Sequence, residues 1–235
     1  MQLVELMNDR SPIILALDTP DVESALGLIK STHEVISIYK LGLEYFLAHG
    51  KPGIETIQRA FPDVDIFLDL KLHDIPNTVG GASSSISELK PRFLTVHASG
   101  GMEMVRAAVT QLPSTSITAV TVLTSLTSQE LKELGLPDEP ASLAMTLAQR
   151  AVKAGATSIV CSPHEASALR ERLGNGVTII TPGVRPEGSG KDDQNRVMTP
   201  KDAMKQGANY VVIGRPITQA INPGEAALAI MNSLA

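Results

Sequence analysis

The chain is poor in cysteine and has no long apolar run. Cys161 is the only cysteine among 235 residues, so an internal disulfide is impossible and a reducing compartment is expected. No stretch approaches the roughly 18 consecutive apolar residues of a membrane-spanning helix. The first ten residues lack the basic start and apolar core of a signal peptide. We therefore expect a cytoplasmic protein with no membrane partner.

The chain also has little net charge. The formal net charge is -5, which is too mild to indicate nucleic acid or an anionic membrane as the general partner. Any anionic ligand must therefore be met by a local group of Lys and Arg. Linkers and low-complexity tracts are absent, and the length suits one α/β domain over residues 1–235.

Short apolar runs recur along the chain at a regular spacing. Segments with helical spacing lie between them, such as the Ala-rich span 142–154. Eight β-then-α units of this kind predict a single closed (β/α)8 TIM barrel. An open doubly wound sheet is the alternative, but the chain has no Gly-rich first turn. The eight expected strands are 13–18, 36–40, 65–71, 93–97, 117–124, 158–162, 177–181 and 210–214.

The third run ends in charged residues where apolar ones are expected. Asp69 and Lys71 lie at its end and Asp74 just beyond it, although burying a charge is unfavourable unless the charge is paired. Period-two alternation puts Asp69 and Lys71 on the inward face of the strand. Active sites of such barrels lie at the carboxyl ends of the strands, so this position predicts catalytic residues.

Other strands also end in polar residues or in glycine and proline. Their gathering at one end of a barrel favours a common functional site. These strand-end residues are Asp18, Lys40, His97, Thr124, Pro182, Arg185, Gly214 and Arg215.

Each residue alone has a structural alternative. Asp18 precedes Thr-Pro and could cap a helix, while Lys40 could be a solvated strand end. Asp69 and Lys71 could form a purely structural ion pair. His97 is more typical of a core or supporting group than of a direct catalyst.

The last two strands indicate a phosphate site. Barrels often bind phosphate through the loops after strands seven and eight, helped by helix N-termini. Gly214 offers backbone amides there, and Arg215 offers a guanidinium. The glycine-rich loop at about 183–195 has a composition that suits a lid. Arg185, Gln194 and Arg196 are the polar side chains that it could bring to a phosphate.

Motifs along the whole chain resemble those of the orotidine 5'-phosphate decarboxylase family. The D-x-K-x-x-D core is shared with related phosphosugar-binding barrels, but joined to I-P-N-T and G-R-P-I-T it is specific. The matching segments are L-A-L-D at 15–18, Lys40 with Gly42, D-L-K-L-H-D-I-P-N-T at 69–78, V-H-A-S-G-G at 96–101, T-P-G-V-R-P at 181–186, D-Q-N-R at 193–196 and V-I-G-R-P-I-T at 212–218.

The resemblance implies a role for each matching residue. Lys71 corresponds to the lysine that delivers a proton to pyrimidine C6 as carbon dioxide leaves, within a charge array completed by Lys40, Asp69 and Asp74. The implied substrate contacts are Asp18 and Lys40 to the ribose, Thr124 to the pyrimidine, and Arg185, Gln194, Gly214 and Arg215 to the phosphate, with Pro182 as a further substrate contact.

The resemblance also implies a homodimer with shared active sites, which Asp74, Ile75 and Thr78 enter from the neighbouring subunit. No cofactor is expected, because the sequence shows no site for one. No metal is expected either, since the five histidines are scattered without ligand spacing.

Two rival functions remain. One is a metal-dependent phosphosugar decarboxylase or synthase, such as 3-keto-gulonate 6-phosphate decarboxylase or hexulose-phosphate synthase. The other is a non-catalytic barrel that senses a phosphorylated ligand.

Overall fold

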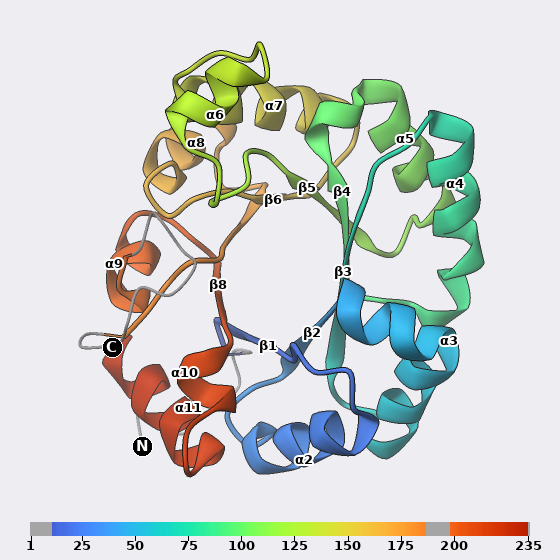
Figure 1. Ribbon diagram of the computed structural model, residues 1–235, viewed down its shortest axis with the longest axis vertical. Helices are drawn as coiled ribbons and strands as arrows, with labels where there is room; N and C mark the ends of the chain where they lie inside the picture. Colours follow the sequence, from blue (N-terminus) through green and yellow to red (C-terminus); the bar gives the residue numbers. More distant parts are fainter. Residues whose placement is uncertain (1–10, 187–197, 235) are drawn as a thin grey trace.

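Eight parallel strands close into a barrel in a computed structural model that describes residues 11–186 and 198–234. Each strand pairs with its neighbour in sequence, and β1 pairs with β8, which closes the ring (Figure 1). The open-sheet alternative is therefore wrong. The strands are β1 Ile13–Ala16, β2 Ile38–Gly42, β3 Asp65–Leu72, β4 Phe93–His97, β5 Ser116–Val120, β6 Ser158–Val160, β7 Thr178–Thr181 and β8 Tyr210–Ile213.

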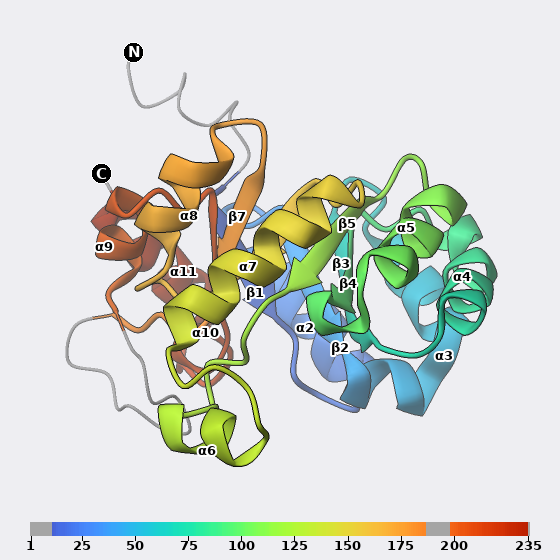
Figure 2. The ribbon, with the colours of Figure 1, turned by 90° about the horizontal axis from the view of Figure 1, so that it is seen from above.

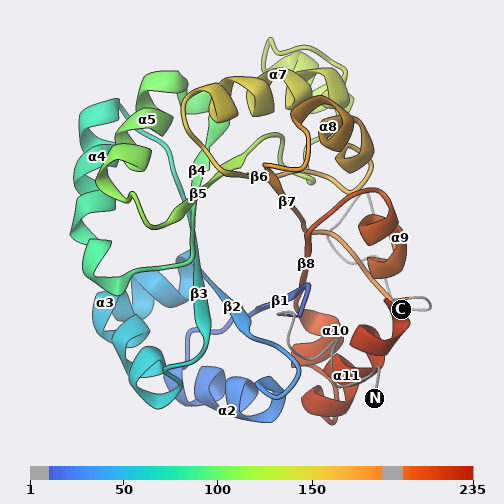
Figure 3. The same cartoon turned by 180° about the vertical axis from the view of Figure 1, so that it is seen from behind.

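Helices surround the barrel on the outside. Views from opposite ends show them as a ring around the strands (Figures 1 and 3), and the side view shows α6 projecting beyond one end (Figure 2). No helix of the described chain is long and apolar enough to cross a membrane. The α-helices are α2 Val22–Thr32, α3 Leu43–Ala60, α4 Pro76–Ser85, α5 Met102–Gln111, α6 Ser128–Glu133, α7 Pro140–Lys153, α8 Ala166–Leu173, α9 Pro200–Lys205, α10 Arg215–Thr218 and α11 Pro223–Ser233; short 3₁₀ turns are η2 Ser87–Leu89 and η3 Ala98–Gly100.

All eight predicted strands are present with ends within two residues of the prediction, except the fifth, which ends earlier than expected. The apolar run 117–124 predicted a strand reaching Thr124, whereas β5 ends at Val120. Beyond it, Val122 leaves the barrel and packs with Leu131 and Ala144 in a separate apolar cluster. The apolar residues after Val120 thus serve a cluster beside α6 and α7, and Thr124 lies in a loop.

Alternation along the strands separates two apolar layers. Ile66, Leu68 and Leu70 belong to the large cluster shared with the surrounding helices. Phe67 points the other way and packs in the barrel interior, where its ring lies 5.5 Å from that of Phe93. The predicted faces of β3 are therefore confirmed up to Leu70, and the inward face leads directly to Asp69.

A polar group closes the amino-terminal end of the barrel. Arg92 donates hydrogen bonds from Nη1 to Asp65 Oδ2 at 2.6 Å and from Nη2 to the Tyr210 hydroxyl at 2.7 Å. Its guanidinium also lies over the rings of Phe93 and Tyr210. The pairing of Arg92 with Asp65 therefore suits a structural role, because the active sites of such barrels lie at the opposite end.

Candidate active site

Four charged residues meet at the carboxyl ends of β1, β2 and β3. Strand register explains the meeting, because Ala16 pairs with Lys40 and Gly42 pairs with Asp69. Asp18 lies two residues beyond the end of β1, and its carboxylate reaches the Lys40 ammonium. The side chains come from separate parts of the sequence and are brought together by the parallel sheet.

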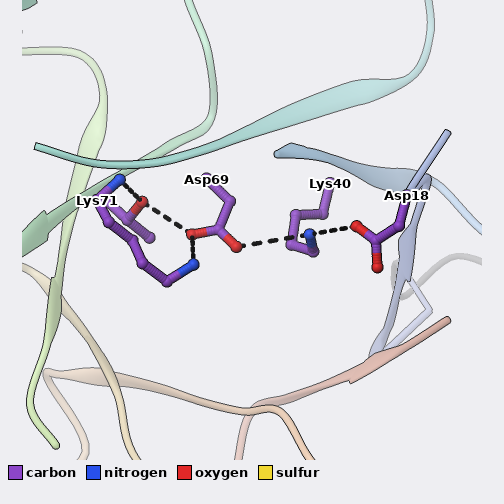
Figure 4. Close-up of polar contacts among 5 residues, drawn as sticks. Asp18, Lys40, Asp69 and Lys71 are labelled. Atoms are coloured by element: carbon purple, nitrogen blue, oxygen red, sulfur yellow. Dashed lines mark hydrogen bonds and ion pairs between the residues drawn. The ribbon is translucent and has the colours of Figure 1, made fainter. Parts of the chain in front are cut away.

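The four side chains form a line of alternating charge, drawn in Figure 4. Lys71 Nζ lies 2.8 Å from Asp69 Oδ1, and Lys40 Nζ lies 3.5 Å from Asp69 Oδ2. Lys40 Nζ also donates to Asp18 Oδ1 at 3.0 Å. We refer to Asp18, Lys40, Asp69 and Lys71 as the charge array.

The inner members of the charge array are strongly shielded from water. The side chains of Lys40 and Asp69 are only 11% and 13% exposed. Burial alone would raise the pKa of Asp69, but Lys40 and Lys71 outweigh it and hold that pKa below its usual value. Burial would likewise lower the pKa of Lys40, and Asp69 and Asp18 raise it. Both groups therefore keep their charge at neutral pH.

The lowered pKa predicts an acid-dependent contribution of Asp69 to stability. Its ionisation favours the folded state above the unfolded pKa of about 3.9, and that contribution disappears as pH falls through the folded pKa. Between about pH 5 and pH 2, the free energy of unfolding should fall more for the unmodified protein than for Asp69→Asn. Urea unfolding at successive pH values measures this. A difference in unfolding free energy between the unmodified protein and Asp69→Asn that stays constant over this pH range would contradict the prediction. Asp202→Asn, which changes an exposed carboxylate, is the control.

A cavity of about 210 Å³ opens beside the charge array. It is lined by all four array members together with Leu17, Gly42, Leu43, Glu44 and Tyr45. Gly42 borders the charge array closely, since a Cβ there would stand 3.4 Å from Lys40 Nζ. Sequence reasoning missed Leu43, Glu44 and Tyr45 as lining residues, because they belong to the start of a helix.

The backbone at Lys71 has an unusual conformation. Its φ is 47°, a left-handed value that costs a non-glycine residue about 1–3 kcal/mol. The register between β3 and β4 shifts between Leu68 and Leu72, so the strand bulges at this residue. The freed Lys71 N–H donates to Thr95 Oγ1 at 2.8 Å. Thr95 was missed from the sequence, although it shares the inward face of β4 with His97.

The segment after β3 turns outward. Asp74, Ile75 and Thr78 are all exposed, with Ile75 at 65%. Asp74 Oδ1 accepts a hydrogen bond from the Ile75 N–H at 2.6 Å. Within one described chain, therefore, Lys71 is paired with Asp69, whereas Asp74 points to the surface just before α4.

The predicted phosphate residues lie in three different settings. Gly214 adjoins the charge array, because a Cβ there would stand 3.8 Å from Asp18 Oδ2, and Arg215 begins α10 as an exposed residue. Pro182 directly follows β7. Arg185 is buried, and its Nη1 donates to the Val184 carbonyl oxygen at 2.9 Å. Gln194, Arg196 and most of the expected lid at 183–195 lie outside the described residues.

Two structural alternatives from the sequence are wrong. Asp18 does not cap the next helix, because the N-cap of α2 is Asp21, whose Oδ2 accepts from Ser24 N–H at 2.7 Å. Lys40 is not a solvated strand end, since β2 continues to Gly42 and the side chain is nearly buried. An ion pair of Asp69 with Lys71 is present, and its geometry suits a structural and a catalytic role alike.

His97 faces a second histidine. Its ring lies 5.3 Å from that of His73, and burial, His73 and Lys71 together lower the pKa of His97. The lowered pKa favours the neutral imidazole, and Lys71 and Asp69 of the charge array are among the charges that act on it. Among the described residues, no group of three or more His, Cys, Asp or Glu is arranged to hold a metal ion.

Known proteins resemble this chain over nearly its whole length. A family model described as "Orotidine 5'-phosphate decarboxylase / HUMPS family" matches residues 11–230. An orotidine 5'-phosphate decarboxylase of Thermobifida fusca is 50% identical, over 95% of this chain and 96% of its own length. One from Frankia casuarinae is 45% identical, over 96% of this chain and 88% of its own. The crystal structure of orotidine 5'-phosphate decarboxylase from Lactobacillus acidophilus has a TM-score of 0.82 at 34% identity and covers 95% of this chain and 99% of its own.

Proposed function

The chain belongs to the orotidine 5'-phosphate decarboxylase / HUMPS family, and from that premise we propose that it decarboxylates orotidine 5'-phosphate to UMP in the cytoplasm, in pyrimidine biosynthesis. The observation that carries the proposal is the charge array at the carboxyl end of the barrel. Its line of Asp18, Lys40, Asp69 and Lys71 opens onto a cavity. It supplies fixed charges, and its lysine ammonium groups can stabilise the negative charge that develops on a carbanion.

Lys71 is the proton donor in this reaction. The bond from C6 to the carboxylate breaks, its electron pair stays on C6, and a proton moves from Lys71 Nζ to C6 as carbon dioxide leaves. Lys71 is well placed to regain a proton from water, because its side chain is 32% exposed. Asp69 holds the ammonium from the other side at 2.8 Å and opposes the carboxylate of the bound substrate.

Repulsion between Asp69 and the substrate carboxylate cannot account for the whole rate enhancement. Two unit charges 4 Å apart interact by about 1 kcal/mol in water and ~4 kcal/mol at an effective dielectric of 20. Enzymes lower barriers by roughly 8–23 kcal/mol, so repulsion between Asp69 and the substrate carboxylate is too small alone. Stabilisation of the developing carbanion by Lys71, together with binding energy from the phosphate, supplies the remainder.

The rest of the nucleotide extends along the array toward β8. Asp18 and Lys40 bind the ribose hydroxyls, and the Gly214–Arg215 turn with Gln194 binds the phosphate. The closeness of Gly214 to Asp18 supports this direction, since it places the proposed phosphate site next to the proposed ribose site. Thr124 borders the pyrimidine, and Pro182 is a further substrate contact.

The active sites are shared across a homodimer. Exposed apolar side chains near the cavity support this, because Leu43 is 48% exposed while lining it, and Leu47 is 79% exposed on the same helix. Ile75 is exposed beside Asp74, and a second subunit would cover both. Asp74 of one subunit then stands next to Lys71 of the other, with Ile75 and Thr78 contacting the same substrate.

A substrate panel tests the proposal against the metal-dependent rival. Incubation of orotidine 5'-phosphate with the purified chain should lower the absorbance at an ultraviolet wavelength where the substrate absorbs more strongly than UMP, and EDTA should leave the rate unchanged. 3-Keto-gulonate 6-phosphate should not be turned over, with or without added divalent metal. Turnover of the phosphosugar alone would overturn the proposal. Nucleotide binding without turnover would favour the sensor.

A further inference from the structure

The backbone amide of Lys71 donates to one buried hydroxyl, that of Thr95. Among described non-glycine residues, only Lys71 and Lys90 have positive φ, and Lys90 is merely the left-handed cap of a short turn. At Lys71 the strand leaves its register, and the amide N–H points to Thr95 Oγ1 at 2.8 Å instead of to a ladder carbonyl. An amide buried at this position needs an acceptor, and Thr95 provides it.

The same hydroxyl also fixes the carboxylate beside Lys71. Thr95 Oγ1 donates to Asp69 Oδ1 at 3.0 Å, and Lys71 Nζ donates to that same oxygen at 2.8 Å. The directions follow from chemistry, since the amide can only donate and an ionised carboxylate can only accept. Thr95 itself is fully buried, so water cannot substitute for it.

Resting on the proposed function, we propose that Thr95 is a positioning residue for the decarboxylation. Its hydroxyl joins the backbone of Lys71 to the carboxylate of Asp69 and thereby sets the direction in which Nζ points. The left-handed backbone persists because this contact supports it. Without the hydroxyl, Lys71 relaxes toward ordinary strand geometry, and its ammonium shifts relative to C6.

Three substitutions at this position separate the hydroxyl from the packing. Thr95→Val keeps the shape and removes the hydroxyl, Thr95→Ala removes the hydroxyl and a methyl group, and Thr95→Ser keeps the hydroxyl. Thr118→Val is the matched control. Thr118 is equally buried and pairs with Thr95 across β4 and β5, but its hydroxyl bonds Ser158 at 2.5 Å.

We expect kcat for orotidine 5'-phosphate to fall about 10- to 100-fold in Thr95→Val and Thr95→Ala, with KM little changed. Thr95→Ser should recover most of the lost kcat, and Thr118→Val should retain it. Should Thr95→Val not fold, the comparison of Thr95→Ala with Thr95→Ser decides alone.

Undiminished kcat in both hydroxyl-free variants would overturn the role of Thr95, as would equal losses in Thr95→Ser and Thr95→Ala. A loss of the same size in Thr118→Val would overturn it too, because that would indicate general disturbance of the barrel interior. An unmodified protein that turns over no orotidine 5'-phosphate would refute the proposed function instead, so the two failures are distinguishable.

Discussion

Replacing Lys71 by alanine is expected to lower kcat/KM for orotidine 5'-phosphate by at least about 1,000-fold. In the proposed mechanism, the substitution removes both the positive charge that stabilises the carbanion and the proton that neutralises it. It also leaves Asp69, which is nearly buried, with Lys40 as its remaining cationic partner at 3.5 Å. Steady-state loss of ultraviolet absorbance measures the effect.

Lys51→Ala is the matched control for this prediction. Lys51 is a half-exposed lysine of α3 that pairs loosely with Glu88 at 3.9 Å, and it does not line the cavity. Its removal should leave kcat/KM unchanged. Comparable activity of Lys71→Ala and the unmodified protein would remove Lys71 from the mechanism.

Mixing two inactive variants is expected to restore activity. Asp74→Ala alone should lose activity, because in the proposed homodimer it withdraws a carboxylate from the partner's site. In a mixed dimer with Lys71→Ala, however, one site carries both substitutions and the other carries neither. After random exchange of subunits, roughly a quarter of all sites should be intact, since half of the dimers are mixed.

The mixing experiment uses exchange of subunits under mild denaturant followed by the absorbance assay. Each variant treated alone is the control and should stay inactive. Absence of recovery, with mixed dimers demonstrated by a size or charge tag, would show that Asp74 acts within its own subunit. Full activity of Asp74→Ala would show that it does not act at all.

The barrel could be predicted because its elements are marked locally and repeated. Each strand is a short apolar run, and the closed order follows from eight similar units. The boundary of β5 could not be predicted, since Val122 is apolar for a different reason: it packs with Leu131 outside the barrel. A run of apolar residues shows that they are buried but does not show against what.

The charge array was predictable for a similar reason. Charges at the end of an inward strand face are rare unless they are paired, so Asp69 and Lys71 stood out. The choice between roles for Asp18 required the structure, because an aspartate before Thr-Pro caps helices as readily as it binds a ligand. Only the distances show that Asp21 caps α2 and that Asp18 faces Lys40.

The left-handed backbone of Lys71 left no trace in the sequence. Lysine carries no preference for positive φ, and the register shift between β3 and β4 is a property of two strands together. Thr95 was hidden for the same reason. Its alternation with His97 places it on the inward face, but only the bulge brings the Lys71 amide within 2.8 Å of its hydroxyl.

The central claim is that fixed charges around Lys71 carry out the decarboxylation without a metal or cofactor. The most direct test is to strip the purified protein with EDTA, desalt it, and measure carbon dioxide and UMP formed from orotidine 5'-phosphate. We predict one carbon dioxide and one UMP for each substrate consumed, at the rate of the untreated protein. No product, or product only after a divalent metal is restored, would contradict the claim.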